Sequence, residues 1–187
     1  MSTRKIIVYI AMSADGYIAR PDGDVEWLNR PRKAGDYGMA AFYRTIDTIL
    51  WGRKTHEFGL QHGHFDSKVK NYVFSHQPKP STTPPGVEFV SEAIDAFAKR
   101  LRGARGKNIW MMGGASLIGS FLDAGDIDEF IVHVIPIFIG AGIPLIQPRH
   151  RSMPLALKST RRFSDGVVRL HYETRKRAPS RKSEKSA

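Results

Sequence analysis

Cysteine is absent from the 187-residue sequence, and this absence removes several classes of function at once. Without thiols the chain has no disulfides, no thiol nucleophile, no iron–sulfur cluster and no thiolate zinc site. The lack is compatible with a reducing cytoplasm, where we expect the protein to act. Long apolar runs are missing too, since the longest, residues 130–146, is interrupted by a histidine, two prolines and two glycines. We therefore expect no membrane-spanning segment.

Acidic residues are outnumbered, with 18 Asp and Glu against 29 Lys and Arg, and the net charge is +11. Much of this excess lies in residues 175–187, a segment with too few apolar residues to fold by itself, which predicts a disordered basic tail. A second basic stretch covers residues 149–162. We interpret both as solvated surface, and weak, salt-sensitive contact with nucleic acid or another polyanion is the alternative. Residues 1–174 are predicted to form one domain.

Strand-like and helix-like segments alternate along the chain, which is typical of an α/β domain with a largely parallel sheet. Strands are predicted at residues 5–12, 48–51, 71–75, 87–90, 108–111, 128–135 and 167–174. Helices are predicted at residues 39–45, 91–101 and 115–122, the second with Ser91 as its N-cap. The proline-rich residues 77–86 are predicted to form a surface loop.

Two of the predicted strands run into glycine turns that suit phosphate binding. One turn is Gly52-Arg53-Lys54-Thr55, which combines a close-approaching backbone with a guanidinium fork, although a solvated turn would have the same sequence. The other begins at Gly113-Gly114 and leads into a helix, whose first amides attract anions. Neither turn is a Rossmann fingerprint or a P-loop. Because parallel strands end at one edge of a sheet, we expect both turns to border one nucleotide crevice.

A polar loop, residues 13–24, follows the first predicted strand, where a lid over a small-molecule site would lie. Asp15 is a candidate for substrate binding, and turn formation with Gly16 is the alternative explanation for it. Trp27 is a second candidate because its ring could stack on a substrate, although a tryptophan more often belongs to the core.

These segments together resemble dihydrofolate reductase-like proteins, in particular the branch related to the reductase domain of riboflavin biosynthesis. The resemblance runs from about residue 5 to residue 174. It rests on five short motifs in the family's order, namely Ser13 to Ala19, Gly52 to Thr55, Ser75 to Pro78, Gly113 to Ala115 and Asp128 to Leu145. It implies a three-layer α/β/α fold with a central mixed, mostly parallel sheet. It also implies a homodimer, with a subunit contact at residues 128–135 and the Gly140-Ala141-Gly142 loop.

The activity that the resemblance implies is an NADPH-dependent reductase, which transfers hydride to a C=N or C=O bond of a pterin-like or pyrimidine-like ring. In this assignment Arg53 and Thr55 hold the 2′-phosphate and the diphosphate side, and Ser75 with His76 flanks the adenosine. Backbone groups of Ala11 and Ile18 hold the nicotinamide carboxamide. The full set of predicted cofactor-binding residues is Ala11, Ile18, Gly52, Arg53, Lys54, Thr55, Ser75, His76, Gly113, Gly114, Ala115, Ser116 and Leu117.

Asp36 is the candidate catalytic residue, because the family's spacing back from Gly52 leads to it. A partly buried carboxylate at this position would bind the amino-pyrimidine edge of a substrate and raise the basicity of its ring. The alternative is that Asp36 caps the short helix predicted after it.

The sequence departs from its relatives just after the first glycine turn. The riboflavin-pathway reductases carry an Asp-Asp-Pro element there, and this chain has residues 56–64, which include His56, His62 and His64. The departure argues against a ribose-phosphate substrate. We interpret the histidines as solvated or structural rather than as metal ligands, so no metal site is predicted. Two other functions stay open, a nucleotide-binding protein without turnover and a polyanion binder acting through the tail.

Overall fold

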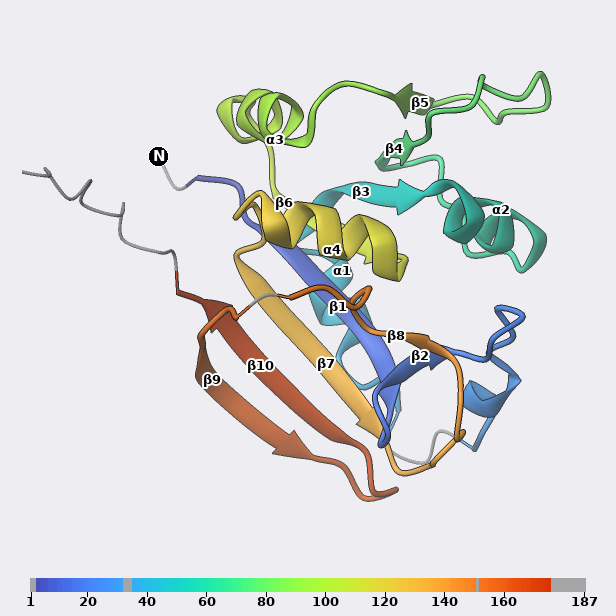
Figure 1. Cartoon of the computed structure of the whole chain (residues 1–187), viewed down its shortest axis with the longest axis vertical. Helices are drawn as coiled ribbons and strands as arrows, with labels where there is room; N and C mark the ends of the chain where they lie inside the picture. The colour runs from blue at the N-terminus through green and yellow to red at the C-terminus, as the bar shows by residue number, and fades with distance from the viewer. Residues whose placement is uncertain (1–2, 32–34, 151, 176–187) are drawn as a thin grey trace, which may run out of the picture.

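Eight strands form one continuous sheet in the order β5-β4-β3-β6-β1-β7-β10-β9 (Figure 1). The computed structural model describes residues 3–31, 35–150 and 152–175, so the basic tail expected at 175–187 lies outside it except for Arg175. Six strands run parallel, and β10 and β9 join antiparallel at one side. The strands of this sheet are β1 (Ile6–Ser13), β3 (Ile46–Gly52), β4 (Lys70–Phe74), β5 (Val87–Val90), β6 (Asn108–Gly113), β7 (Glu129–Ile135), β9 (Leu155–Arg162) and β10 (Val168–Thr174).

Helices cover both faces of the sheet, because side chains of successive strand residues point to opposite faces. In β1, Ile6 and Val8 belong to the core cluster beneath α3 (Ile94–Gly103) and α4 (Ala115–Asp123). Ile7 and Tyr9 point the other way and pack with Phe42 of α1 (Met39–Tyr43). The helix α2 (Arg53–Gln61) lies on this second face, where its Gly59 packs on the ring of Trp51. These layers are the expected α/β/α arrangement.

Three short elements border the end of β1. The strands β2 (Tyr17–Ala19) and β8 (Ile143–Pro144) pair antiparallel as a small second sheet, and η1 (Glu26–Leu28) is a single 3-10 turn. Figure 1 shows β2 and β8 beside the carboxyl ends of β1 and β7. No helix of the described residues is long and apolar enough to cross a membrane.

All seven predicted strands are present within two residues at each end, but several elements escaped prediction. The short strands β2 and β8 and the exposed edge strand β9 were not expected, and no bounds were predicted for the helix α2 that follows Gly52. The proposed N-cap Ser91 is wrong, because α3 begins at Ile94 after Ala93, and no side chain of the described residues caps it.

The strand β7, where we expected a subunit contact, is internal to the sheet. It pairs with β1 on one side and with β10 on the other. A second subunit therefore cannot extend the sheet at β7, and the homodimer, with the Gly140-Ala141-Gly142 loop as its expected contact, stays a prediction.

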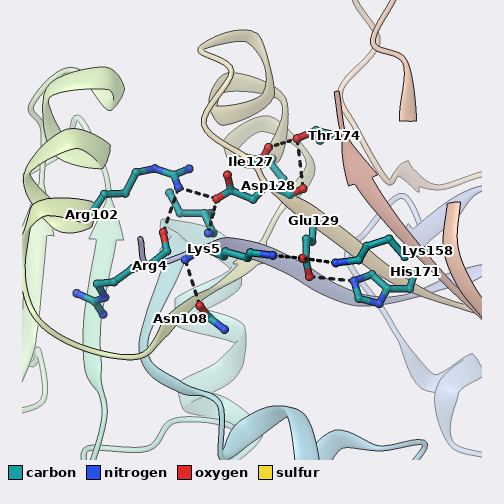
Figure 2. Close-up of polar contacts among 11 residues, drawn as sticks. Arg4, Lys5, Arg102, Asn108, Ile127, Asp128, Glu129, Lys158, His171 and Thr174 are labelled. Carbon is teal, nitrogen blue, oxygen red and sulfur yellow. Dashed lines mark hydrogen bonds and ion pairs between the residues drawn. The ribbon is translucent and has the colours of Figure 1, made fainter. Parts of the chain in front are cut away.

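A buried carboxylate fixes the antiparallel strands to the parallel part of the sheet. Glu129 of β7 accepts hydrogen bonds from Lys5 at 2.6 Å, from Lys158 of β9 at 2.9 Å and, at 2.9 Å, from His171 of β10 when that ring nitrogen carries a proton (Figure 2). Burial raises the pKa of Glu129, but the three partners outweigh burial and lower it to about 2. One ionised side chain thus holds three neighbouring segments on β7.

Candidate functional site

The two glycine turns meet at the carboxyl edge of the parallel strands, as expected. Trp51 at the end of β3 is the ladder partner of Gly113 at the end of β6. A Cβ added to Gly52 would lie 3.3 Å from the Gly114 nitrogen and 3.4 Å from the Gly113 oxygen. The turns approach closely because Gly52 has no side chain to hold them apart.

Each turn leads directly into a nine-residue helix, α2 after Gly52 and α4 after Gly114. Among the described residues, no side-chain oxygen caps the start of either helix, so the first-turn N–H groups are available to an anion. A Cβ on Gly114 would lie 3.2 Å from Oγ1 of Thr55, which places that hydroxyl beside the second turn. Backbone donors of α4 and a hydroxyl of α2 therefore face one small region.

Not every residue of the two motifs can use its side chain there. Leu117 is buried in the core beneath α4, so only its backbone can contact a ligand. Ala115 is also buried, whereas Ser116 and Lys54 are exposed. The predicted contact of Lys54 thus depends on a long, solvated side chain.

Arg53 extends this region toward the end of β4. Its guanidinium donates to the Pro78 carbonyl at 3.1 Å and to the Ser75 hydroxyl at 3.5 Å, and it also pairs with Glu57 at 2.9 Å. Beside it is an open cavity of about 340 Å³. The cavity is lined by Ser75, His76, Gln77, Pro78, Lys79, Phe89, Val90 and Ser91. Ser75 and His76, the residues expected to flank an adenosine, therefore line this cavity, and Arg53 contacts two of its lining residues, Ser75 and Pro78.

Ala11 lies two residues before the end of β1, Ile18 is the middle residue of β2, and both are partly exposed. Ala11 is the ladder partner of His133 in β7. Ala11 therefore lies one strand beyond the second glycine turn in the sheet order, and Ile18 belongs to the small second sheet beside it.

Asp15 connects the loop after β1 with the loop after β7. Its carboxylate accepts hydrogen bonds from the Ser13 hydroxyl at 2.6 Å and from the amides of Ile139 at 3.1 Å and Gly140 at 2.8 Å. These donors, the hydroxyl most of all, lower the pKa of Asp15. The geometry gives Asp15 a structural role, and its contact with substrate stays a prediction.

Trp27 is a core residue, 8% exposed, and packs with Ile135, Phe163 and Val167. Its indole N–H is buried and has no hydrogen-bond partner among the residues that the structure describes. Buried indole N–H groups usually find an acceptor. Stacking on a substrate stays a prediction.

Asp36 is exposed, so the partly buried environment expected for it is wrong. Its two carboxylate oxygens accept hydrogen bonds from the amides of Gly38 at 2.9 Å and Ala40 at 2.8 Å. These bonds at the start of α1 lower the pKa of Asp36, and Ala40 contributes most. Asp36 is not the N-cap residue, which is Gly38, but its bond from the Ala40 amide at the first turn of α1 resembles capping, and the catalytic role stays a prediction.

A cluster of polar side chains beneath α1, formed by Tyr9 and His133, was not predicted from the sequence. The Tyr9 hydroxyl lies 3.5 Å from His133 Nε2 and donates to the Tyr37 carbonyl at 3.3 Å. Burial lowers the pKa of His133 to about 4 and raises the pKa of Tyr9 to about 12, so both are neutral at pH 7. The sequence did carry one signal for this group, since His133 is a histidine among apolar neighbours in the predicted strand at residues 128–135.

The three histidines after the first glycine turn do not converge. His56 is buried among the rings of Trp51, Phe65 and Phe89, whereas His62 and His64 are exposed. Within the described ranges, no group of three histidines or acids could hold a metal ion.

Known proteins are similar to this chain in sequence and in architecture. YwjB, an uncharacterized protein of Bacillus subtilis (strain 168), is 40% identical over 178 residues, which are 90% of this chain and 97% of YwjB. A protein from Shewanella sp. PV-4 assigned to riboflavin biosynthesis has a solved structure that is 25% identical. Its TM-score is 0.75, over 91% of this chain and 99% of that one.

A more distant structure identifies the fold. The dihydrofolate reductase of Enterococcus faecalis, complexed with NADP(H), aligns with a TM-score of 0.64 at 14% identity, over 91% of this chain and 96% of that one. This likeness confirms the dihydrofolate reductase-like fold. The profile of the RibD C-terminal domain matches residues 4–169. The chain therefore belongs to the RibD C-terminal domain family and is a reductase-like member of the dihydrofolate reductase-like fold.

Proposed function

We propose that the protein is an NADPH-dependent reductase of a small pterin-like or pyrimidine-like heterocycle or of a carbonyl compound. The observation that carries the proposal is the contact between the Gly52 and Gly113-Gly114 turns, with Thr55 between them and Arg53 at the cavity beside Ser75. A Cβ on Gly52 would lie against the backbone of Gly113 and Gly114, so glycine at this position lets the two turns, and the helix starts that follow them, lie side by side. Family membership supports a reductase rather than another nucleotide-binding enzyme.

The residues present fit this cofactor. Arg53 would bind the 2′-phosphate through its guanidinium, exchanging its exposed partner Glu57 for a doubly charged group. The first-turn amides of α4 and the Thr55 hydroxyl would hold the diphosphate, and backbone groups of Ala11 and Ile18 would orient the nicotinamide. NADPH, when bound, supplies the hydride, and the protein supplies its binding and orientation.

A nucleotide-binding protein without turnover is the second candidate, because the one acid proposed for catalysis is exposed and engaged with α1. NADPH oxidation, followed with dihydrofolate, pterins, aminopyrimidines and simple carbonyls, separates the two. Turnover of any of them establishes a reductase, whereas tight NADPH binding without turnover supports the second candidate.

The cofactor assignment is tested by Arg53→Ala. We expect this change to weaken NADPH at least about tenfold more than NADH, because only NADPH has the 2′-phosphate. Lys99→Ala removes an exposed cation on α3 and is the control, expected to change neither affinity. Fluorescence titration of both cofactors gives the affinities, and equal losses for NADPH and NADH in Arg53→Ala would refute the phosphate assignment.

A further inference from the structure

The loop after β1 and the loop after β7 are in direct backbone contact. The Leu145 amide donates a hydrogen bond to the Gly16 carbonyl at 3.1 Å. Beside it β2 pairs with β8 (Figure 1), and a Cβ added to Gly142 would collide with the Ala19 carbonyl oxygen. The two loops are therefore held together as one unit.

Asp15 links the same two loops through its side chain. Its Oδ2 accepts hydrogen bonds from the amides of Ile139 at 3.1 Å and Gly140 at 2.8 Å, and its Oδ1 accepts one from the Ser13 hydroxyl at 2.6 Å. That hydroxyl accepts a hydrogen bond in turn from the Tyr17 amide at 3.0 Å. A continuous chain of hydrogen bonds thus runs from the loop after β7, through Asp15 and Ser13, to the first residue of β2.

This chain of hydrogen bonds closes the turn between the two positions expected to hold the nicotinamide. Ser13 is fully buried and ends β1, two residues after Ala11. Tyr17 begins β2, one residue before Ile18. The bond between the Ser13 hydroxyl and the Tyr17 amide therefore fixes how the backbone at Ala11 is placed relative to the backbone at Ile18.

We propose that Asp15 is a positioning residue for the nicotinamide half of the cofactor, and that it acts through Ser13 on the backbone of this turn. An ionised acceptor suits the role, because hydrogen bonds to a charged group are about twice as strong as neutral ones. Asp15 acts here without touching the reacting atoms. The inference deepens the proposed function and rests on it for the identity of the cofactor.

The test compares two ligands that differ only in the nicotinamide half. NADPH and 2′-phospho-ADP-ribose, which lacks the nicotinamide, are titrated into the full chain, and calorimetry gives both affinities. We expect Asp15→Ala to weaken NADPH about tenfold or more and to change 2′-phospho-ADP-ribose less than about twofold. Loss of a negative charge would by itself favour both anionic ligands, so a loss confined to NADPH is not a charge effect.

Asp22→Ala is the matched control. Asp22 is an exposed carboxylate in the same loop, and its Oδ1 accepts a hydrogen bond from the Asp24 amide at 3.0 Å. This variant removes the same charge and one local bond, and it should keep both affinities.

Two further variants test the chain of hydrogen bonds itself. Ser13→Ala removes the hydroxyl and leaves the carboxylate, so it should show the same selective loss, and it stays informative if Asp15→Ala fails to fold. Asp15→Asn keeps an oxygen for the two amides and should lie between Asp15→Ala and the wild type. The double variant of Ser13→Ala and Asp15→Ala should lose little more than the larger single loss, because both act through one chain.

Equal losses for the two ligands in Asp15→Ala and Ser13→Ala would show a general structural role and overturn the proposal. Unchanged NADPH affinity in both variants would overturn it as well. The proposed function is judged separately by the wild type, since failure to bind either ligand would refute the cofactor itself, whereas binding of both with equal losses in the variants refutes only the role of Asp15.

Discussion

At the scale of single residues, a carboxylate that caps a helix differs chemically from one that supplies a proton. Asp36 accepts two backbone hydrogen bonds, which stabilise its ionised form. Such a group can receive a hydrogen bond from a substrate but is a poor proton donor at neutral pH. Its two possible roles therefore respond differently to substitution.

We expect Asp36→Ala to lower the melting temperature by roughly 2–4 °C, because it removes both bonds at the start of α1. Asp36→Asn keeps one acceptor and should melt close to the wild type. Calorimetry gives these values, and kcat/KM of the two variants is measured in parallel. A hundredfold loss of kcat/KM in Asp36→Asn, without a change in melting, would establish the catalytic role and contradict a purely capping one.

At the scale of elements, the site depends on how closely two strand-to-helix turns approach. Gly52→Ala would place a Cβ against the backbone of Gly113 and Gly114, which cannot move aside as a side chain can. We expect a loss of about 1–3 kcal/mol in the free energy of unfolding and at least about tenfold weaker NADPH binding.

Gly103→Ala is the matched control for this change. Gly103 ends α3, and a Cβ there would meet no atom within 4 Å. Alanine at this position should keep NADPH affinity and leave stability unchanged or slightly higher. Urea unfolding and fluorescence titration measure both quantities. If Gly52→Ala behaves as Gly103→Ala does, the turns are not in functional contact.

At the scale of the whole molecule, stability in acid should depend on Glu129. Its folded pKa of about 2 lies below the value of 4.5 for an unperturbed glutamate. A depressed pKa contributes stability above pH 4.5, and that contribution is lost as the pH falls through 2. The shift corresponds to about 3 kcal/mol.

We therefore expect Glu129 to contribute about 3 kcal/mol to the fall in the free energy of unfolding of the wild type between pH 4.5 and pH 2, in addition to the contributions of other carboxylates with lowered pKa such as Asp15 and Asp36. Glu129→Gln should be less stable at pH 7 and show a flatter slope in this window. Glu26→Gln, a change at an exposed residue, is the control and should follow the wild type. Urea unfolding at several pH values gives the slopes, and parallel slopes for wild type and Glu129→Gln would contradict this account.

The strands were predictable because each one is a short apolar run with a turn signal after it, as in residues 46–51 followed by Gly52. β9 was missed because it is an exposed edge strand in which Lys158, Arg161 and Arg162 replace the apolar pattern. α2 was missed because it is polar, and its packing depends on Gly59 lying against Trp51. Local patterns identify elements that bury a regular face, and they fail where burial is slight.

The sequence by itself determined where along the chain seven strands lie and that glycine turns follow β3 and β6, because apolar periodicity and glycine act locally. Only the tertiary structure decided that Gly52 touches Gly113 and Gly114 and that Arg161 and Arg169 lie opposite each other. These facts depend on which strands become neighbours and in what register. Register is fixed by the packing of the whole sheet, which no short segment encodes.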